Sequence, residues 1–326
     1  PYEFKKEVDL PENFSYAGCV SWKDEILICG GYLNNACYSY NVKRQEYKKI
    51  CHYPEGVKLF GHMVVAYGEG GEKVNGKESL KLLSLGGGDS FALGYHTLQM
   101  TYVSVWDNEE ANKNYEGVNE WKALPNNQIF GKKNRDNLEG VRGVIGGEHN
   151  DLLFLTHRAK QIDVINLKSF EYVESPKNSY LPISSGFLCY HAFIAIRKTT
   201  FVLICEKEAL QIQYDQLQNS FSYQNLPSCD SLKDVYNFGF INLLSDIFLF
   251  GGWNDSVPLG SVVFTLYIYH HEQKEWEQVK FPNMQSLSGS TGIFSNCDSA
   301  IHLLGGHVLH SPITSHFSLQ GCVIKA

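Results

Sequence analysis

The chain has 326 residues, with 43% hydrophobic, 13% aromatic and 19% charged residues and a formal net charge of −7 at pH 7. The negative charge disfavours non-specific binding to nucleic acid or to an anionic membrane surface, because both require a basic face. No apolar run approaches the roughly 20 residues that a membrane-spanning helix needs. Many aromatic and few charged residues are typical of a strand-rich globular protein that can bury a sizeable core.

Cysteine usage and the start of the chain bear on its compartment. The nine cysteines are an odd number without a Cys-x-x-Cys pair, and Cys19, Cys29, Cys189 and Cys205 lie within or at the end of apolar runs. Buried free cysteines behave as small apolar residues, so we expect reduced thiols in a cytoplasmic protein. The alternative is a disulfide or a reactive thiol. The chain begins at Pro1 without an initiator methionine or a signal-peptide core, which we interpret as a fragment or a processed form.

Short apolar runs bounded by Gly, Asn and Pro recur along the chain and predict short strands. Six copies of a four-strand unit of about 50 residues align on the end of the second strand. In chain order, these ends are residues 28–31, 84–87, 154–157, 203–206, 249–252 and 303–306. A Gly-Gly pair closes four of them, whereas the third and fourth copies carry Thr156-His157 and Cys205-Glu206. The Gly pairs predict a turn whose backbone requires positive φ.

The other strands follow from the same alignment. The first strands share a column of glycine or histidine that we expect to crowd around a central channel: Gly18, His62, Gly143, His191, Gly239 and Gly292. Third strands are predicted at residues 37–40, 102–105, 162–165, 210–214, 266–269 and 316–319. Fourth strands begin with an aromatic plug between neighbouring units, at Tyr47, Trp121, Phe170, Phe221 and Trp276. The polar residues 68–76 predict a long hairpin loop between the first two strands of the second copy.

The sixth copy ends one strand short. Residues 4–11 repeat the aromatic, apolar and proline layout of residues 276–282, so we expect the N-terminal segment to supply the missing fourth strand. Closing the ring in this way removes a free sheet edge.

Together, the four Gly-Gly pairs and the well-placed Trp121 and Trp276 resemble the kelch-repeat β-propeller family, of the galactose oxidase-type propeller superfamily. The resemblance implies an all-β, six-bladed propeller of four-stranded antiparallel blades, with residues 1–326 as a single domain. The expected blades are approximately residues 14–54, 57–125, 140–175, 186–227, 235–282, and 288–326 plus 1–11. The family also implies a protein-binding scaffold, as in actin-associated proteins and ubiquitin-ligase adaptors, and includes a few enzymes.

The resemblance to galactose oxidase raises the question of a copper site, which needs two His, two Tyr and a Cys near one Tyr. His62, His191, Tyr190 and Cys189 supply these residue types. The two histidines belong to the second and fourth copies and are expected to project from non-adjacent blades, whereas a metal needs convergent imidazoles. Cys189 and Tyr190 are neighbours, which point to opposite faces of a strand. We therefore expect packed histidines, no metal and no cofactor.

Two further clusters are interpreted as structural. Four histidines lie near the C-terminus: His302, His307, His310 and His316. Strand alternation is expected to separate His302 from the loop group. A weak metal site is the alternative for them. A basic hairpin, interrupted by Glu46 and expected to be a solvated outer edge, carries Lys43, Arg44, Lys48 and Lys49.

The loops that lead into each first strand and leave each second strand emerge at one end of the ring, and loops on a rigid scaffold often carry function. The candidate binding residues there are Arg142, Arg158, Trp253, His307, Tyr95, Asn34 and Asp255. Two arginines can grip a carboxylate or phosphate and Trp253 can stack on a side chain, so we expect an acidic or phosphorylated peptide. The structural alternative is an ion pair for Arg142, with Trp253 and Tyr95 covering loop backbone.

We therefore predict a non-catalytic protein–protein interaction module, a scaffold or adaptor, that binds a partner protein or peptide on this face. The sequence contains no nucleophile elbow, no His-Glu-x-x-His motif and no paired catalytic carboxylates. We expect no nucleic-acid, membrane or small-molecule ligand. Two alternatives stay open: a propeller enzyme, either a copper-radical oxidase or a sugar epimerase acting at the channel mouth, and a glycan-binding module.

Overall fold

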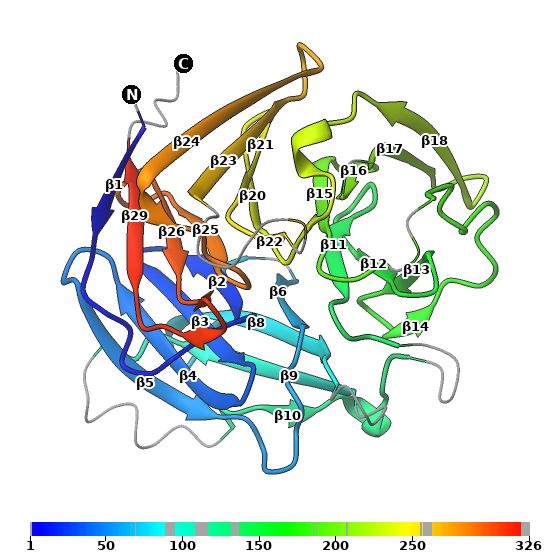
Figure 1. Ribbon diagram of the computed structural model, residues 1–326. Helices are drawn as coiled ribbons and strands as arrows, with labels where there is room; N and C mark the ends of the chain where they lie inside the picture. Colours follow the sequence, from blue (N-terminus) through cyan, green and yellow to red (C-terminus); the bar gives the residue numbers. More distant parts are fainter. Residues whose placement is uncertain are drawn as a thin grey trace.

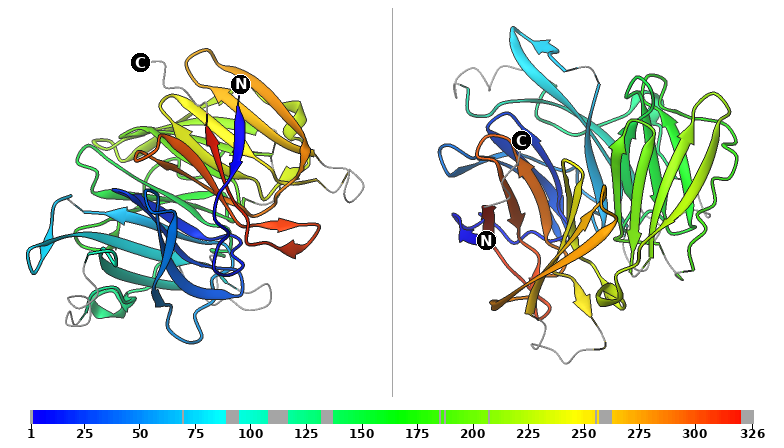
Figure 2. Two further views of the ribbon diagram at one scale, coloured as in Figure 1. Left: turned by 90° about the vertical axis from the view of Figure 1, so that its left-hand side faces the viewer. Right: turned by 90° about the horizontal axis from the view of Figure 1, so that it is seen from above.

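The computed structural model describes residues 2–68, 70–88, 95–107, 117–131, 137–184, 186, 188–206, 208–254, 256 and 263–320. Six antiparallel sheets stand in a ring within these residues, each built on a path of four strands (Figures 1 and 2). The protein is therefore an all-β, six-bladed propeller, as the sequence predicted.

The first three blades follow one another along the chain from the innermost to the outermost strand. Blade 1 contains β2 (Gly18–Trp22), β3 (Glu25–Gly31), β4 (Asn34–Asn41) and β5 (Glu46–His52). Blade 2 contains β6 (His62–Tyr67), β8 (Lys77–Gly86), β9 (His96–Val103) and β10 (Lys122–Ala123). Blade 3 contains β11 (Arg142–Gly146), β12 (Leu152–His157), β13 (Gln161–Asn166) and β14 (Glu171–Tyr172).

The last three blades have the same layout. Blade 4 contains β15 (Ala192–Arg197), β16 (Thr200–Cys205), β17 (Glu208–Asp215) and β18 (Ser220–Leu226). Blade 5 contains β20 (Gly239–Leu243), β21 (Asp246–Phe250), β23 (Val263–His270) and β24 (Glu275–Gln285). Blade 6 contains β25 (Thr291–Ser295), β26 (Ala300–Leu304), β29 (His316–Gln320) and β1 (Glu3–Lys6).

Several short elements decorate the connections between these strands. The 3₁₀ turns are η2 (Pro125–Asn127) and η3 (Asp230–Leu232). Two small sheets are formed by β19 (Val235–Tyr236) with β22 (Trp253–Asn254) and by β27 (His307–Val308) with β28 (Ser311–Pro312). The predicted hairpin loop at residues 68–76 contains a short strand, β7 (Lys73–Val74), which pairs with the start of β8. The sequence prediction missed this strand because its surroundings are polar and rich in Gly.

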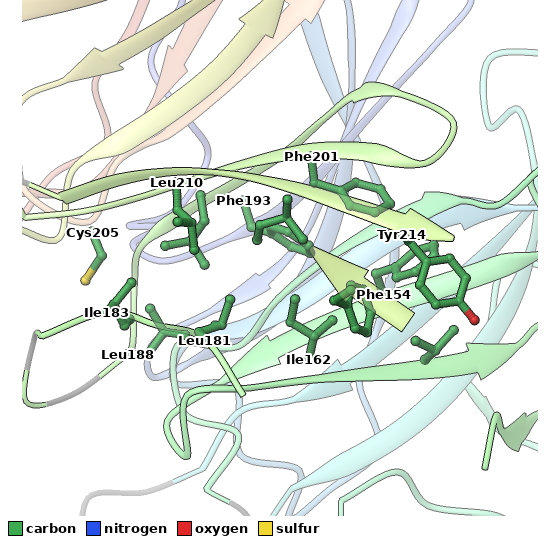
Figure 3. Packing of buried hydrophobic residues seen from close by; sticks show 14 of the residues in the cluster. Phe154, Ile162, Leu181, Ile183, Leu188, Phe193, Phe201, Cys205, Leu210 and Tyr214 are labelled. Atoms are coloured by element: carbon green, nitrogen blue, oxygen red, sulfur yellow. The ribbon is translucent and has the colours of Figure 1, made fainter. Parts of the chain in front are cut away.

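The hydrophobic core lies between neighbouring blades. The second strands are mostly apolar, and β3 is buried at every position because both of its faces are covered. The cluster between blades 3 and 4 combines Phe154 and Ile162 of blade 3 with Phe193, Phe201 and Tyr214 of blade 4 (Figure 3). Each blade therefore depends on the next to bury its apolar faces.

The predicted column of the first strands is out of register in three blades. Strand pairing places Gly18 opposite Cys29, Gly143 opposite Leu155 and Gly239 opposite Phe250, in each case just before the Gly-Gly position. By the same pairing, the equivalent residues of the other blades are Met63, Ala192 and Thr291. The expected His62, His191 and Gly292 are each displaced by one residue, because residue type rather than register guided the alignment. A shift of one residue moves a side chain to the other face of the strand.

The Gly-Gly turns have the backbone that the sequence predicted. Gly305 has φ +57°, and a Cβ there would lie 2.0 Å from the carbonyl oxygen of Phe14. The next residue, Gly306, donates its N–H to that same oxygen over 2.7 Å. Only glycine permits both the positive φ and this approach to the neighbouring blade.

The ring is closed by the N-terminal strand, as the sequence predicted. Strand β1 runs antiparallel beside β29, with Glu3 opposite Gln320 and Lys6 opposite Phe317 (Figure 1). The ring of Phe4 contacts Phe264, with ring centroids 5.1 Å apart. The N-terminal strand thus covers the edge of blade 6 and packs on blade 5.

The aromatic plugs differ in depth. Trp121 is 5% exposed and stacks on Tyr53 with ring centroids 4.7 Å apart. Trp276 packs on Tyr269 at 5.0 Å but is only partly buried, with its indole N–H donating to the carbonyl of Pro227 over 2.9 Å.

Deleting residues 1–10 should lower the melting temperature by several degrees and cause concentration-dependent association, because β29 would become a free edge. Differential scanning calorimetry and light scattering measure the two effects. Lys6→Ala, a change at an exposed position of β1, is the control and should behave like the parent. A truncated protein that melts unchanged and stays monomeric would contradict the closing role.

Trp121→Ala should reduce the free energy of unfolding by about 3–5 kcal/mol, because it leaves a cavity between blades. Trp276→Ala should have a smaller effect, since part of its surface already faces solvent. Denaturant titration measures the free energy of unfolding of both variants. An equal or larger loss for Trp276→Ala would show that the depth of burial does not determine which tryptophan contributes more to stability.

Candidate functional site

One end of the ring carries the segments that lead into first strands and leave second strands. We call this end the loop face; it includes residues 13–17, 30–34, 57–61, 137–141, 188–191, 235–238, 286–290 and 305–310. In each blade, a residue of left-handed conformation precedes the first strand: Tyr16, Gly61, Gly140, Tyr190, Asn237 and Gly289. These six positions turn the chain from the loop face into the channel wall.

Aromatic rings from three blades meet over the channel. The ring of Tyr16 in blade 1 lies 5.0 Å from that of Tyr190 in blade 4, measured between centroids. Phe60 of blade 2 lies 5.3 Å from Tyr16 and 5.7 Å from Tyr190. Blades 1 and 4 stand opposite each other in a six-bladed ring, so contact between their side chains bridges the channel. We call Tyr16, Phe60 and Tyr190 the aromatic lid.

The lid depends on unusual backbone conformations. Tyr16 and Tyr190 have φ values of 53° and 54°. The left-handed region costs a residue with a side chain about 1–2 kcal/mol, so the surrounding contacts must hold it. Gly61 leaves the necessary space, because a Cβ there would lie 2.8 Å from the ring of Tyr190. Backbone bonds tie the loops together, from Gly140 N–H to Gly61 at 2.9 Å and from Tyr190 N–H to Gly140 at 3.0 Å.

A cavity of about 210 Å³ lies in the channel, bordered by the lid residues Tyr16 and Tyr190. Its wall comes from the first strands and the residues before them, including Met63, Val64, Phe240 and Ser290. Arg142 is the one charged side chain among the lining residues.

Arg142 begins β11 and reaches into this cavity. Its Nε donates to the carbonyl of His191 over 3.0 Å, and its Nη1 donates to Val141 over 3.1 Å. The guanidinium lies 5.9 Å from the ring centroid of Tyr190 and 5.6 Å from that of Phe240. Among the described residues it forms no ion pair with Asp or Glu, so the structural ion pair considered from the sequence is not what holds it. Burial lowers the pKa of Arg142, an effect opposed by the nearby Tyr190, Cys189 and Tyr16.

Arg158 occupies a different environment from Arg142. Its Nη1 lies 3.8 Å from Oε2 of Glu139, whose other oxygen accepts a hydrogen bond from the Tyr190 hydroxyl over 3.1 Å. Burial and the Glu139 carboxylate both raise the pKa of Tyr190. Burial also raises the pKa of Tyr16, to about 12. Both lid tyrosines are therefore neutral at physiological pH. Because Arg158 pairs with Glu139 whereas Arg142 bonds to backbone carbonyls, the two arginines do not form one symmetrical anion-binding site.

A groove of about 500 Å³ runs between the loops of blades 1 and 2. We call it the apolar groove; it is lined by residues 31–35, 57–60 and 88. Leu33 is 89% exposed and Tyr32 is 39% exposed at its rim. The ring of Tyr32 lies 4.6 Å from Phe60, so the groove leads directly to the lid.

The remaining candidate residues have separate surroundings. Asn34 supports its own loop, since its side-chain nitrogen donates to Asn13 over 3.0 Å and its oxygen accepts from the Ala36 N–H over 2.9 Å. Tyr95 packs against the core of blades 2 and 3. His307 lies 5.9 Å from Tyr16, beside the lid. Asp255 lies outside the described residues.

Trp253 and His310 form an aromatic pair on the loop face, with ring centroids 4.4 Å apart. Trp253 belongs to β22, and His310 lies in the turn between β27 and β28. Leu309 beside them is 44% exposed. His310 follows His307 by three residues, and the pair extends the aromatic surface over blades 5 and 6.

The histidines considered for copper are engaged separately. Nδ1 of His62 lies 2.8 Å from the Leu59 carbonyl, and its Nε2 lies 2.9 Å from that of Cys29. Nε2 of His191 lies 2.6 Å from the Thr156 hydroxyl. Among the residues that the structure describes, no three His, Cys, Asp or Glu side chains form a group that could hold a metal ion. The eight cysteines of that part of the chain are all free thiols.

The sequence did not reveal a histidine chain between blades 6 and 1. The Tyr47 hydroxyl lies 2.7 Å from Nδ1 of His316, whose Nε2 lies 2.7 Å from Nδ1 of His302. Nε2 of His302 lies 3.1 Å from Asp298. The C-terminal histidines therefore divide into this buried pair and the loop-face residues His307 and His310. No local signal connects Tyr47 to residues some 270 positions later.

The basic hairpin of blade 1 is engaged with its neighbours. Lys43 pairs with Asp24 at 2.7 Å, and Lys49 lies 3.8 Å from Glu12. Arg44 and Lys48 lie over the indole ring of Trp106, at 5.3 Å and 4.8 Å from its centroid. These contacts are those of a blade edge.

Comparisons with known proteins address the fold. No protein-family model and no curated protein matches the chain. Among solved structures it is similar to the one titled "Structure of YjhT", with a TM-score of 0.65 and 10% sequence identity, covering 96% of this chain and 99% of that one. At this identity the likeness supports the propeller fold. In the described part of the chain, no helix is long and apolar enough to cross a membrane.

Buried histidines should make the protein less stable in mild acid. Burial holds the pKa of His191 well below its usual range, so the unfolded chain takes up its proton first. This stability is complete above about pH 6.5 and falls by up to about 1.4 kcal/mol per pH unit as the pH drops toward the folded pKa. Denaturant titrations at pH 7.5, 6.5 and 5.5 should show a shallower decline for His191→Asn than for the parent. Parallel declines would contradict a neutral His191.

Proposed function

We propose that the protein is a non-catalytic interaction module, a scaffold or adaptor of the kelch type, that binds a partner protein or peptide over the loop face. The apolar groove carries this proposal. Leu33 is almost completely exposed at its rim, where a monomeric protein gains nothing from an apolar side chain. Exposed apolar residues beside a concave surface are typical of interaction sites.

A continuous aromatic row supports the same face. The ring centroids of Tyr32 and Phe60 are 4.6 Å apart, those of Phe60 and Tyr16 are 5.3 Å apart, and those of Tyr16 and His307 are 5.9 Å apart. The row crosses from blade 1 to the β27–β28 hairpin, in whose turn Leu309 is exposed. Aromatic side chains of this kind are favoured as interface anchors because they bury much area with few rotatable bonds.

The partner that fits best contributes apolar side chains to the groove and an acidic or phosphorylated group at its border. Lys58 lines the groove, and Arg158 lies near the lid beside Glu139. Arg142 lies in the channel and is therefore not part of the contact we propose. A kelch-type origin is supported by the Gly-Gly turns and by N-terminal closure, and free thiols support a cytoplasmic location.

A photoreactive amino acid placed at position 33 should crosslink one defined partner in an extract of the native cells. The same residue at position 217 is the matched control, because Leu217 is fully exposed at the opposite end of the ring. Tyr32→Ala combined with Phe60→Ala should reduce recovery of that partner at least about tenfold, since two anchors are lost. Mass spectrometry identifies and quantifies the partner, and circular dichroism checks the fold.

Crosslinking of the same protein from position 217, or unchanged recovery with the doubly substituted groove, would overturn the assignment to the loop face. Recovery that fails instead when Lys43, Arg44, Lys48 and Lys49 are neutralised would place the interaction at the blade 1 edge.

A further inference from the structure

We propose that the channel below the aromatic lid binds a small organic monocarboxylate, whose carboxylate pairs with Arg142. This site is separate from the apolar groove, because the lid lies between them. The loop-face proposal and the channel proposal can therefore fail independently.

The first observation is a guanidinium without a counterion. Arg142 bonds only to the carbonyls of His191 and Val141 and forms no ion pair with Asp or Glu of the described chain. Arg142 is partly buried, and a charge withdrawn from water in this way is stabilised when it is paired or fully hydrogen-bonded. Two carbonyl bonds satisfy part of the five donors of a guanidinium, and the remaining donors are available to an anion. A carboxylate matches the planar guanidinium geometry and binds it bidentately.

The second observation is the charge and polarity of the wall. Arg142 carries the one formal charge among the lining residues, and His62, also in the wall, has a lowered pKa through burial. A single positive charge is balanced by a singly charged ligand rather than by a doubly charged phosphate. Met63, Val64 and Phe240 supply an apolar surface next to the guanidinium. The ligand therefore has one carboxylate and an apolar body.

The third observation is an unused hydroxyl on another blade. The Oγ atom of Ser290 is buried, has no hydrogen-bond partner, and belongs to a residue that lines the same cavity. Buried polar atoms are almost always hydrogen-bonded, so this hydroxyl of a cavity-lining residue lacks a partner. Ser290 precedes the first strand of blade 6, whereas Arg142 begins that of blade 3. These blades are opposite, and a ligand with a second polar group can reach both.

The size of the cavity fits such a molecule. Its volume of about 210 Å³ exceeds the space of one water, which occupies about 30 Å³ in the liquid. It is too small for a folded segment of another protein. A carboxylate with a ring or a short aliphatic chain is of the appropriate size.

Matched pairs of probes test the proposal: benzoate with benzamide, and hexanoate with hexanamide, together with inorganic phosphate. Ligand-observed NMR on the full chain should detect both carboxylates, with the uncharged amides binding at least about tenfold more weakly. Arg142→Met should weaken carboxylate binding by a similar factor, while the control Arg197→Met, at the exposed end of β15, should leave it unchanged. 3-Hydroxybenzoate should bind more tightly than benzoate, and Ser290→Ala should remove that advantage.

Equal binding of carboxylates and amides, binding that survives Arg142→Met, or no carboxylate binding at all would overturn the proposal. Phosphate that binds as tightly as benzoate would show a general anion site instead. If Arg142→Met does not fold, thermal shifts of the parent protein decide the question. Carboxylates should raise the melting temperature where the matched amides do not, and the absence of that difference would reject the site.

Discussion

The ring depends on backbone contacts between the glycine turns of blades 2, 5 and 6 and the loop of the next blade. Gly252 donates to the carbonyl of Leu287 over 2.7 Å, and Gly306 donates to that of Phe14 over 2.7 Å. In blade 2 the corresponding bond runs from Gly87 to Leu138 over 3.2 Å. These bonds satisfy buried backbone groups and fix the distance between blades at the loop face. They also hold the loops close enough to the axis for side chains of opposite blades to meet.

The strand order, the closing strand and the glycine turns could be predicted from the sequence because each leaves a local signal. Short apolar runs define strands, and Gly-Gly marks a turn with positive φ. The column of the first strands could not be placed by residue type alone. His62 and His191 lie one residue before the aligned positions of Met63 and Ala192, and only the pairing with the second strand reveals the difference. Register is a property of two strands, so a single strand does not specify it.

The candidate site could be predicted only in part, because its residues come from separate blades. Arg142 and His307 were singled out as binding residues of the loop face, and the structure brings them to the channel and to the border of the lid. Tyr16, Phe60 and Tyr190 were missed as a unit because they come from three blades, and their contact follows from ring closure. Tyr16 and Tyr190 share a left-handed backbone conformation. A glycine in the sequence can indicate that conformation, whereas a tyrosine does not.

Blade 1 carries the apolar groove and half of the contact across the channel, and directional bonds hold it on both sides. Toward blade 2, the buried carboxylate of Glu25 accepts hydrogen bonds from Tyr102 and from Ser39. Toward blade 6, Tyr47 bonds to His316. Both seams also contain apolar clusters. Hydrogen bonds to buried groups fix one arrangement and are costly to break. The blade that presents Tyr16, Tyr32 and Leu33 is therefore held in one orientation, which keeps the groove preformed and the lid aligned above Arg142.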